Sequence, residues 1–260
     1  MKQKIYQIDA FANKAFEGNP AMVCPLERWL PDTLMQSIAE ENNLSETAFF
    51  VKEEEGCYHL RWFTPMSEVD MCGHATLACA YVLYRCMDYS RDTITFVTKS
   101  GLLTVGKKDQ HYVMDFPIQA IESCPIPREI EEAFAMKPML ALASMDYIVV
   151  FETEEEVLNA SPDLALLKKL DRRGVCITAK SSRYDFVIRF FAPKVGLDED
   201  PVTGSAFTQV AKYWADVLGK EELHAKQISA RGGEVSCVIV GDRIKISGEA
   251  VLYLEGVIEI

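Results

Sequence analysis

Glu68-Val-Asp-Met-Cys-Gly-His-Ala-Thr-Leu-Ala78 is the stretch that decides the fold. Its polar lead ends in Cys72-Gly73-His74, and the segment that follows is apolar on every side as far as Tyr84. A helix that is apolar all round must be buried, so the stretch predicts an enclosed helix that begins at Gly73. The free N–H groups and the partial positive charge of its N-terminus could hold an anion.

A similar stretch occurs in the second half of the chain, where Glu199-Asp-Pro-Val-Thr-Gly-Ser-Ala206 leads into another apolar segment. Aligning Gly73 with Gly204 gives an offset of 204 − 73 = 131, about half the chain. Four further pairs align at this offset: Glu68 with Glu199, Cys72 with Thr203, His74 with Ser205, and Ala75 with Ala206. The repeat predicts two similar halves, each with a buried helix, and the alternative is two unrelated helices that begin at glycine. If the two helix N-termini face each other, they form one anion pocket.

The length and the composition are those of an ordinary globular protein. The chain has 260 residues, of which 49% are hydrophobic and 25% are charged, and this length suits two domains. A net charge of −12 argues against nucleic acid or an anionic membrane as the partner. The N-terminus has no apolar signal-peptide core, and no apolar run reaches membrane-spanning length. We therefore expect a cytoplasmic protein.

The eight cysteines form no CxxC pair and no cluster with zinc-ligand spacing. In a reducing compartment such cysteines are small hydrophobic core residues, and we expect no bound metal. Cys72 is the exception, because it lies at a predicted helix N-terminus, where the thiolate form would be stabilised.

The order of the predicted elements is strands around one helix, twice, with mostly antiparallel strands. This order predicts the α+β class and not a doubly wound nucleotide-binding fold. Neither a GxGxxG nor a GxxxxGK[ST] motif occurs. The boundary is expected near residue 118, between halves 1–118 and 119–260, with central helices from Gly73 and Ser205. Whether the last strand, 251–260, crosses back to the first half is left open.

Three local patterns in the second half give more detailed predictions. The acidic run 152–156 is interpreted as a solvated turn. Ser161-Pro162-Asp163 predicts a helix with Ser161 as its N-cap, ending at Asp171. Residues 193–203 are expected to form an irregular loop before the second central helix.

Two carboxylates are candidates for proton chemistry. Glu46 is the second residue of the predicted strand 45–51, whose apolar surroundings would desolvate the carboxyl group and raise its pKa toward working pH. The structural alternative is an exposed glutamate at a strand end. Asp200 lies before the second helix, where it could contact His74 or the helix N–H groups, and the alternative is an acid that only caps the helix.

His74 and Ser205 are candidates because each begins a predicted buried helix. A single histidine is more often structural than catalytic, but the other three histidines lie in strand patterns or in a charged surface segment. Ser205 could donate its hydroxyl and its backbone N–H. A serine hydrolase is a weak interpretation because the GxSxG setting is missing, and metal catalysis is weaker still for want of clustered ligands.

Seven motifs spread over nearly the whole chain point to one family: Asp9-Ala-Phe11, Gly18-Asn-Pro-Ala21, Leu44-Ser-Glu-Thr-Ala-Phe49, Arg61-Trp-Phe-Thr-Pro65, the stretch 68–78, Arg189-Phe-Phe-Ala-Pro193 and the stretch 199–206. Together they resemble the PhzF family, the phenazine-biosynthesis isomerase-like proteins, within the diaminopimelate epimerase-like superfamily. The resemblance implies two pseudo-symmetric halves, each a curved, mostly antiparallel sheet or barrel around a central helix, with the site in the cleft between them.

The resemblance also implies roles for the candidates. Glu46 matches the general acid/base of the family, and the other active-site polar positions match His74, Asp200 and Ser205. Backbone amides at four positions would bind a substrate carboxylate, and Asn19 would line the pocket: the four are Gly73, His74, Gly204 and Ser205. The implied reaction needs no cofactor and moves a proton on a small unsaturated or cyclic carboxylic acid, a dihydro-hydroxyanthranilate in the founding members. A homodimer is expected from the family.

The sequence departs from the family pattern at Phe207 and from the two-thiol pattern of the epimerases at Thr203. Phe207 stands where many family members have histidine, which could reshape the pocket wall. The superfamily's epimerases use two thiols, but the repeat partner of Cys72 is Thr203, which argues against a two-thiol racemase. An epimerase that uses Glu46 as its single base, and a non-catalytic binding protein with this fold, stay open as alternatives.

Overall fold

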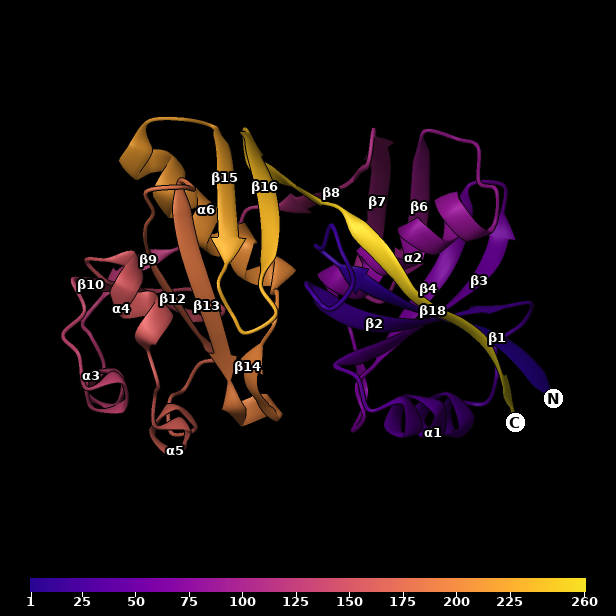
Figure 1. Ribbon diagram of the computed structural model, residues 1–260, viewed down its shortest axis with the longest axis horizontal. Coiled ribbons are helices and arrows are strands. Elements are labelled where there is room, and N and C mark those ends of the chain that lie inside the picture. The colour runs from indigo at the N-terminus through magenta and orange to yellow at the C-terminus, as the bar shows by residue number, and fades with distance from the viewer. The chain divides into compact units, whose positions relative to one another are not determined.

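The computed structural model describes residues 1–260, and the chain forms two compact units. Unit 1 comprises Met1–Asp115 and Ser247–Ile260, and unit 2 comprises Phe116–Ile246. Both units combine a strongly bent, mainly antiparallel sheet with a few helices (Figure 1), so the predicted α+β class is confirmed. The sequence had assigned 119–260 to one half, whereas residues 247–260 join unit 1. No helix is long and apolar enough to cross a membrane.

Unit 1 is a sheet bent around one helix. Its strands are β1 Lys2–Ala10, β2 Asn19–Leu26, β3 Glu46–Glu54, β4 Cys57–Phe63, β5 Glu68–Val69, β6 Thr93–Thr98, β7 Gly101–Lys108, β8 His111–Pro117, which runs past the unit boundary, and β18 Ala250–Glu259. The central helix α2, Gly73–Cys86, begins at the predicted residue and has ten of its 14 residues buried. It packs against β1, β2 and β3 because small residues along it allow close approach.

The other helix of unit 1 is α1, Asp32–Asn42. Its buried residues Met35, Ile38 and Ala39 follow helical spacing, and they form a separate apolar cluster with strand residues that include Phe49. Asn43 ends the helix in the left-handed conformation. The connection through α1, residues 27–45, is the crossover that lets β2 and β3 pair in parallel, since parallel neighbours cannot be joined by a tight turn.

Unit 2 contains the second sheet and the second central helix. Its strands are β9 Glu122–Cys124, β10 Leu140–Ala143, β11 Tyr147–Val150, β12 Val175–Lys180, β13 Phe186–Ala192, β14 Leu197–Asp200, β15 Glu222–Gln227, β16 Gly233–Val240 and β17 Arg243–Gly248, which runs past the unit boundary. Its helices are α3 Arg128–Phe134, α4 Glu154–Asn159, α5 Leu164–Leu167, the 3₁₀ turn η1 Pro193–Val195, and α6 Gly204–Leu218. The long helix α6 packs against β15 and β16 (Figure 1).

The two units repeat one strand order. In unit 1 the pairs β1–β2, β3–β4, β4–β5 and β6–β7 are antiparallel, and the pairs β2–β3 and β4–β6 are parallel. In unit 2 the corresponding pairs β10–β11, β12–β13, β13–β14 and β15–β16 are antiparallel, and the pairs β11–β12 and β13–β15 are parallel. The central helices follow β5 and β14, the matching strands. The internal repeat predicted from a short sequence match therefore extends through each unit.

Several local predictions for unit 2 were wrong. The acidic run 152–156 is not a turn, because Thr153 and Glu156 form a capping box that starts α4. The N-cap of α5 is Asp163 and not Ser161, since the Asp163 side chain accepts from the N–H of Ala165, and the helix ends at Leu167. Residues 193–203 are not wholly irregular, because β14 lies within them and pairs with β13.

Candidate active site

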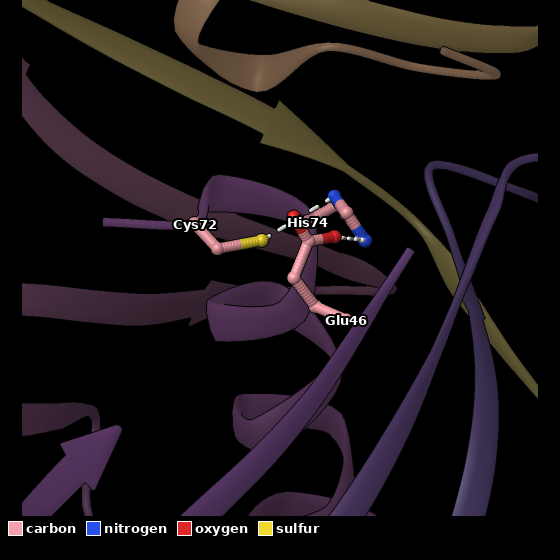
Figure 2. A group of neighbouring side chains, drawn as sticks. All are labelled: Glu46, Cys72 and His74. Carbon is pink, nitrogen blue, oxygen red and sulfur yellow. Dashed lines mark hydrogen bonds and ion pairs between the residues drawn. The ribbon is translucent and has the colours of Figure 1, made fainter. Parts of the chain in front are cut away.

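Glu46 and His74 form a buried polar pair in unit 1 (Figure 2). Glu46 is the first residue of β3, and His74 is the second residue of α2. Oε2 of Glu46 lies 3.1 Å from Nε2 of His74, and their side chains are only 12% and 6% exposed. The two atoms are close but not aligned as a hydrogen bond, and neither has another hydrogen-bond partner in the protein. Buried polar atoms in this state are costly unless a bound reactant completes their hydrogen bonding.

The chain reaches this geometry through a glycine turn and a parallel strand pair. Gly18 has a φ of +67°, and a Cβ there would lie 2.2 Å from the carbonyl oxygen of Ala10. Only glycine can combine this positive φ with so close an approach to another backbone segment. Gly18 thus allows the turn after which Asn19 enters the interior at the start of β2. The Nδ2 atom of Asn19 lies 3.3 Å from Nδ1 of His74. The register of β2 and β3 pairs Ala21 with Glu46, which brings both strand starts to the helix N-terminus.

Cys72 also contacts His74, but its thiol keeps its proton. Cys72 is the N-cap residue of α2, and its Sγ lies 3.5 Å from Nδ1 of His74. Burial, together with the nearby Glu46 carboxylate, raises the pKa of the Cys72 thiol to about 11. The sequence predicted a stabilised thiolate from the helix position alone. That prediction was wrong because desolvation of the charge outweighs the helix N-terminus here.

His74 is shifted toward its protonated form. Burial acts to lower the pKa of His74, but the Cys72 sulfur and the Glu46 carboxylate beside the ring raise it well above the usual value. The ring is fixed from both sides, since Asn19 and Cys72 contact Nδ1 and Glu46 contacts Nε2. His74 can therefore hold a proton next to Glu46 and orient the carboxyl group for proton transfer.

The same three side chains are the group in this chain that could hold a metal ion. One ligand atom from each of Glu46, Cys72 and His74 lies within 4.8 Å of the others. Carboxylate oxygen, thiolate sulfur and imidazole nitrogen are the donors that zinc takes in proteins. A metal there would have to displace the Cys72 proton and occupy the Glu46 carboxylate, so metal binding and proton transfer by Glu46 compete for the same atoms.

In unit 2, Asp200 and Thr203 organise the start of α6. Oδ2 of Asp200 accepts a hydrogen bond of 2.6 Å from Oγ1 of Thr203, the N-cap residue. The N–H of Thr203 donates to Oε1 of Gln227 at 2.7 Å. From the sequence, Asp200 could contact His74 or the helix N–H groups, or could only cap the helix. In unit 2 its carboxylate instead binds the side chain of the N-cap residue, Thr203. Gly204 follows directly as the first helical residue, one position before the predicted start.

Ser205 lies beside a charged cluster that the sequence did not reveal. Its Oγ accepts a hydrogen bond of 3.0 Å from Nη2 of Arg173. Arg173 pairs with the fully buried Asp146, which also accepts from Gln209. The only sequence signal is a charged residue one or two positions before each of the strands β11 and β12, whereas Glu46 is the first residue of β3. That the starts of α2 and α6 act on one substrate stays a prediction.

Phe207 is a core residue of unit 2. It is fully buried, and its ring centroid lies 6.2 Å from that of Phe186, which in turn stacks on Trp214. The sequence suggested that Phe207 could reshape a pocket wall. Within unit 2 its position is explained by packing alone.

Comparison with known proteins identifies the family. The family model for phenazine biosynthesis-like proteins, PhzC-PhzF, matches residues 8–256. A Pseudomonas aeruginosa protein named as an uncharacterized isomerase is 50% identical over 260 residues, which is 100% of both chains. The crystal structure of a PhzF family protein from Enterococcus faecalis is 45% identical, covers 100% of both chains and superposes with a TM-score of 0.98.

A more distant comparison concerns the fold alone. A hydroxyproline epimerase from Agrobacterium vitis has a TM-score of 0.65 at 8% identity, covering 99% of this chain and 92% of that one. The chain is thus an isomerase with the diaminopimelate epimerase-like fold. It belongs to the PhzC-PhzF family of phenazine biosynthesis-like proteins.

Proposed function

We propose that the enzyme shifts a proton between two carbons of a small unsaturated or cyclic carboxylic acid, with Glu46 as the single general acid/base. Glu46 takes a proton from one carbon and returns it to another, which moves a double bond. The first step breaks a C–H bond and forms an O–H bond on Glu46, and the second breaks that O–H bond and forms a C–H bond at the other carbon. No electrons leave the substrate overall, so no cofactor is required. The observation that supports this most is the buried Glu46–His74 pair with unfilled hydrogen bonds.

The start of α2 would stabilise the charge that this reaction creates. Removing a proton next to a carboxylate pushes negative charge onto the carboxylate oxygens. Gly73 and His74 lie in the first turn of α2, where backbone N–H groups have no partner within the helix. Such preorganised donors lower the energy of an oxyanion in a site from which water is excluded. Gly204 and Ser205 are proposed to bind the same substrate from the start of α6, with Asp200 holding that helix start.

The structure favours a one-base isomerase over a two-thiol epimerase. A two-thiol mechanism needs a thiolate on one side of the carbon and a thiol on the other. The Cys72 thiol has a pKa of about 11, so it is protonated at neutral pH. Its counterpart Thr203 uses its hydroxyl to donate to Asp200, and an alcohol is too weak a base for this step. The remaining base at this site is Glu46.

Deuterium uptake followed by NMR tests the proposal. A panel of small unsaturated and amino carboxylic acids, dihydro-hydroxyanthranilate included, is incubated in D₂O with the wild type and with Glu46→Gln. We expect exchange at carbon with migration of a double bond, and a loss of at least about a hundredfold in Glu46→Gln, since a positioned acid/base contributes this much. Glu53→Gln is the matched control, because Glu53 lies on the same strand but is exposed.

Each outcome discriminates between the alternatives. Exchange at Cα alone, with loss of chirality, would replace the isomerase by an epimerase that uses Glu46. Clear binding of an acid without any exchange would favour a non-catalytic binding protein. Equal exchange in Glu46→Gln and the wild type would refute the assigned base. A homodimer and a cytoplasmic location are proposed from the family, and native mass spectrometry tests the first.

A further inference from the structure

Unit 2 contains a cluster of polar side chains at the same place in the repeat as the Glu46–His74 pair. In unit 1, residues at the starts of the parallel strands β2 and β3 converge on the second residue of α2: Asn19 and Glu46 on His74. In unit 2, Asp146 and Arg173 come just before the parallel strands β11 and β12 and pair with each other, and Arg173 also donates to Ser205, the second residue of α6. The repeat therefore has an arginine near the matching strand start, one residue before the position that corresponds to Glu46, since Thr47 pairs with Phe63 and Val175 with Phe191.

The guanidinium group of Arg173 is held in one orientation. Nε and Nη2 donate to the two carboxylate oxygens of Asp146 at 2.9 and 2.6 Å. Asp146 is fully buried, and it is fixed in turn by Gln209, which donates to Oδ2 at 2.8 Å and accepts from the Asp146 N–H at 3.2 Å. The guanidinium carbon lies 5.3 Å from the centre of the Phe190 ring. A bidentate pair of this kind fixes the plane of the group as well as its position.

The neighbouring glycine is needed for this placement. A Cβ on Gly174 would lie 2.7 Å from the Phe190 ring and 2.8 Å from the carbonyl oxygen of Phe191. Any larger residue would push the start of β12 away from β13 and would move Arg173 with it. Because Gly174 has no side chain, the start of β12 can lie close to β13, and this sets the position of Arg173.

Two hydrogen-bond donors of this cluster are left over. Nη1 of Arg173 makes no hydrogen bond within the protein, and the Arg173 side chain is 32% exposed although its partner Asp146 is not exposed at all. The Ser205 oxygen already accepts from Nη2, so its own proton is available to an acceptor. Nη1 shares the guanidinium carbon with Nη2, which contacts the Ser205 hydroxyl, so both donors can reach one anion. If the Arg173–Asp146 pair served only to stabilise the fold, the guanidinium edge that carries Nη1 would not need to be exposed.

We infer that Arg173 binds an anion, the carboxylate of the substrate, together with the hydroxyl of Ser205. The planar guanidinium group presents paired donors that match a carboxylate. Near the matching strand starts of the repeat, unit 1 thus holds the proposed base and unit 2 holds a fixed cation. Asp146 and Gln209 are positioning residues, because they act only through Arg173. The identity of the anion as substrate rests on the proposed function, whereas the anion site itself does not.

The test is a binding measurement that needs no turnover. Crotonate and benzoate, with their neutral amides as controls, are titrated into ¹⁵N-labelled protein while the arginine Nε resonances are followed. Removing Arg173 alone would leave Asp146 buried and unpaired, which endangers folding. The variants are therefore Arg173→Lys, which keeps the charge but loses the fork, and Asp146→Asn with Arg173→Met, which removes both charges. Arg183→Met is the control, because Arg183 is exposed and lies outside the cluster.

We expect the acids, and not the amides, to bind saturably and to shift the Arg173 resonance. Both variants should bind the acids about ten- to a hundredfold more weakly, as expected for loss of a charged hydrogen bond, while Arg183→Met binds like the wild type. Failure of either acid to bind the wild type saturably, or equal affinity in the doubly substituted protein, would overturn the site. Acid binding without any Glu46-dependent exchange would instead reject the proposed function and leave this site standing.

Discussion

Burial decides the chemistry of the individual residues at the start of α2. The sequence places Cys72 and His74 at a helix N-terminus, where a simple rule favours a thiolate. In the structure both are buried next to the Glu46 carboxylate. Burial, with Glu46, raises the pKa of the thiol to about 11, whereas burial acts to lower the pKa of the imidazole and Cys72 and Glu46 raise it well above its usual value. The thiol therefore keeps its proton at neutral pH, and the imidazole is shifted toward its protonated form. Glu46 is left as the group that can accept one.

This protonation state can be measured as thiol reactivity. At pH 8, three units below its pKa of about 11, about one Cys72 in a thousand is a thiolate, and its side chain is 6% exposed. In native protein, iodoacetamide should therefore label the partly exposed Cys57, Cys86 and Cys124 well before Cys72, as followed by peptide mass spectrometry. Unfolding in urea should remove the difference. Labelling of native Cys72 as fast as Cys57 would show a reactive thiolate and revive a thiol mechanism.

Two matching ion pairs brace the strands that lead to the central helices. Arg61 binds Glu68 through Nε and Nη2 at 2.7 and 2.9 Å, and Arg189 binds Glu199 in the same way at the same two distances. The glutamates that supported the sequence repeat are thus structural braces and not catalytic acids. Each pair joins the fourth strand of its series to the segment before the central helix, so it controls where that helix begins.

The two braces should differ in strength because their arginines have different third partners. Nη1 of Arg189 donates to three backbone carbonyls at the end of α4, whereas Nη1 of Arg61 donates to the exposed Asp32. Losing Arg189 leaves carbonyls at a helix C-terminus without a donor. We expect Arg189→Met to lower the free energy of unfolding by about 2 to 3 kcal/mol and Arg61→Met by about 1 kcal/mol.

Urea unfolding of both variants measures this difference. Arg128→Met serves as the control, since the Arg128 side chain is 84% exposed and pairs only with Glu132 in the next turn. It should change the stability very little. Equal losses in Arg61→Met and Arg189→Met would mean that the carbonyl contacts of Arg189 contribute nothing.

At the scale of the whole molecule, the last strand completes the first unit. β18 pairs antiparallel with β1 along its length, and the N–H of Ile260 donates to the carbonyl of Met1. The two chain ends therefore lie side by side (Figure 1). β18 covers one edge of β1 from Lys2 to Ala10, and β2 covers the other edge from Tyr6 to Ala10. The sequence left the place of this strand open, because nothing in its pattern names a partner.

Removal of residues 250–260 should consequently weaken unit 1 and not unit 2. Without β18, β1 becomes an edge strand with unpaired backbone groups. We expect amide hydrogen exchange, followed by mass spectrometry, to become faster in peptides from β1 and β2, with β12 and β13 in unit 2 keeping their protection. A uniform rise of exchange in both units would show that the two units unfold together and that the strand supports more than unit 1.

The sequence by itself determined the elements and most of the candidate residues. The apolar runs after Gly73 and Gly204 require buried helices, and their spacing disclosed the repeat. Glu46 and His74 stood out because a polar group next to an apolar segment is exceptional. These signals are local, since helix periodicity, glycine turns and strand alternation each depend on neighbouring residues.

Only the tertiary structure decided which side chains meet. Asn19, Glu46 and His74 are far apart in the chain and converge because β2 and β3 run in parallel with a fixed register. The same arrangement of β11 and β12 brings together Asp146 and Arg173, whose roles no local pattern could show. Parallel pairing joins segments through long crossovers, so register and burial are set by the packed unit. The pKa of Cys72 follows from that packing and not from its helix position.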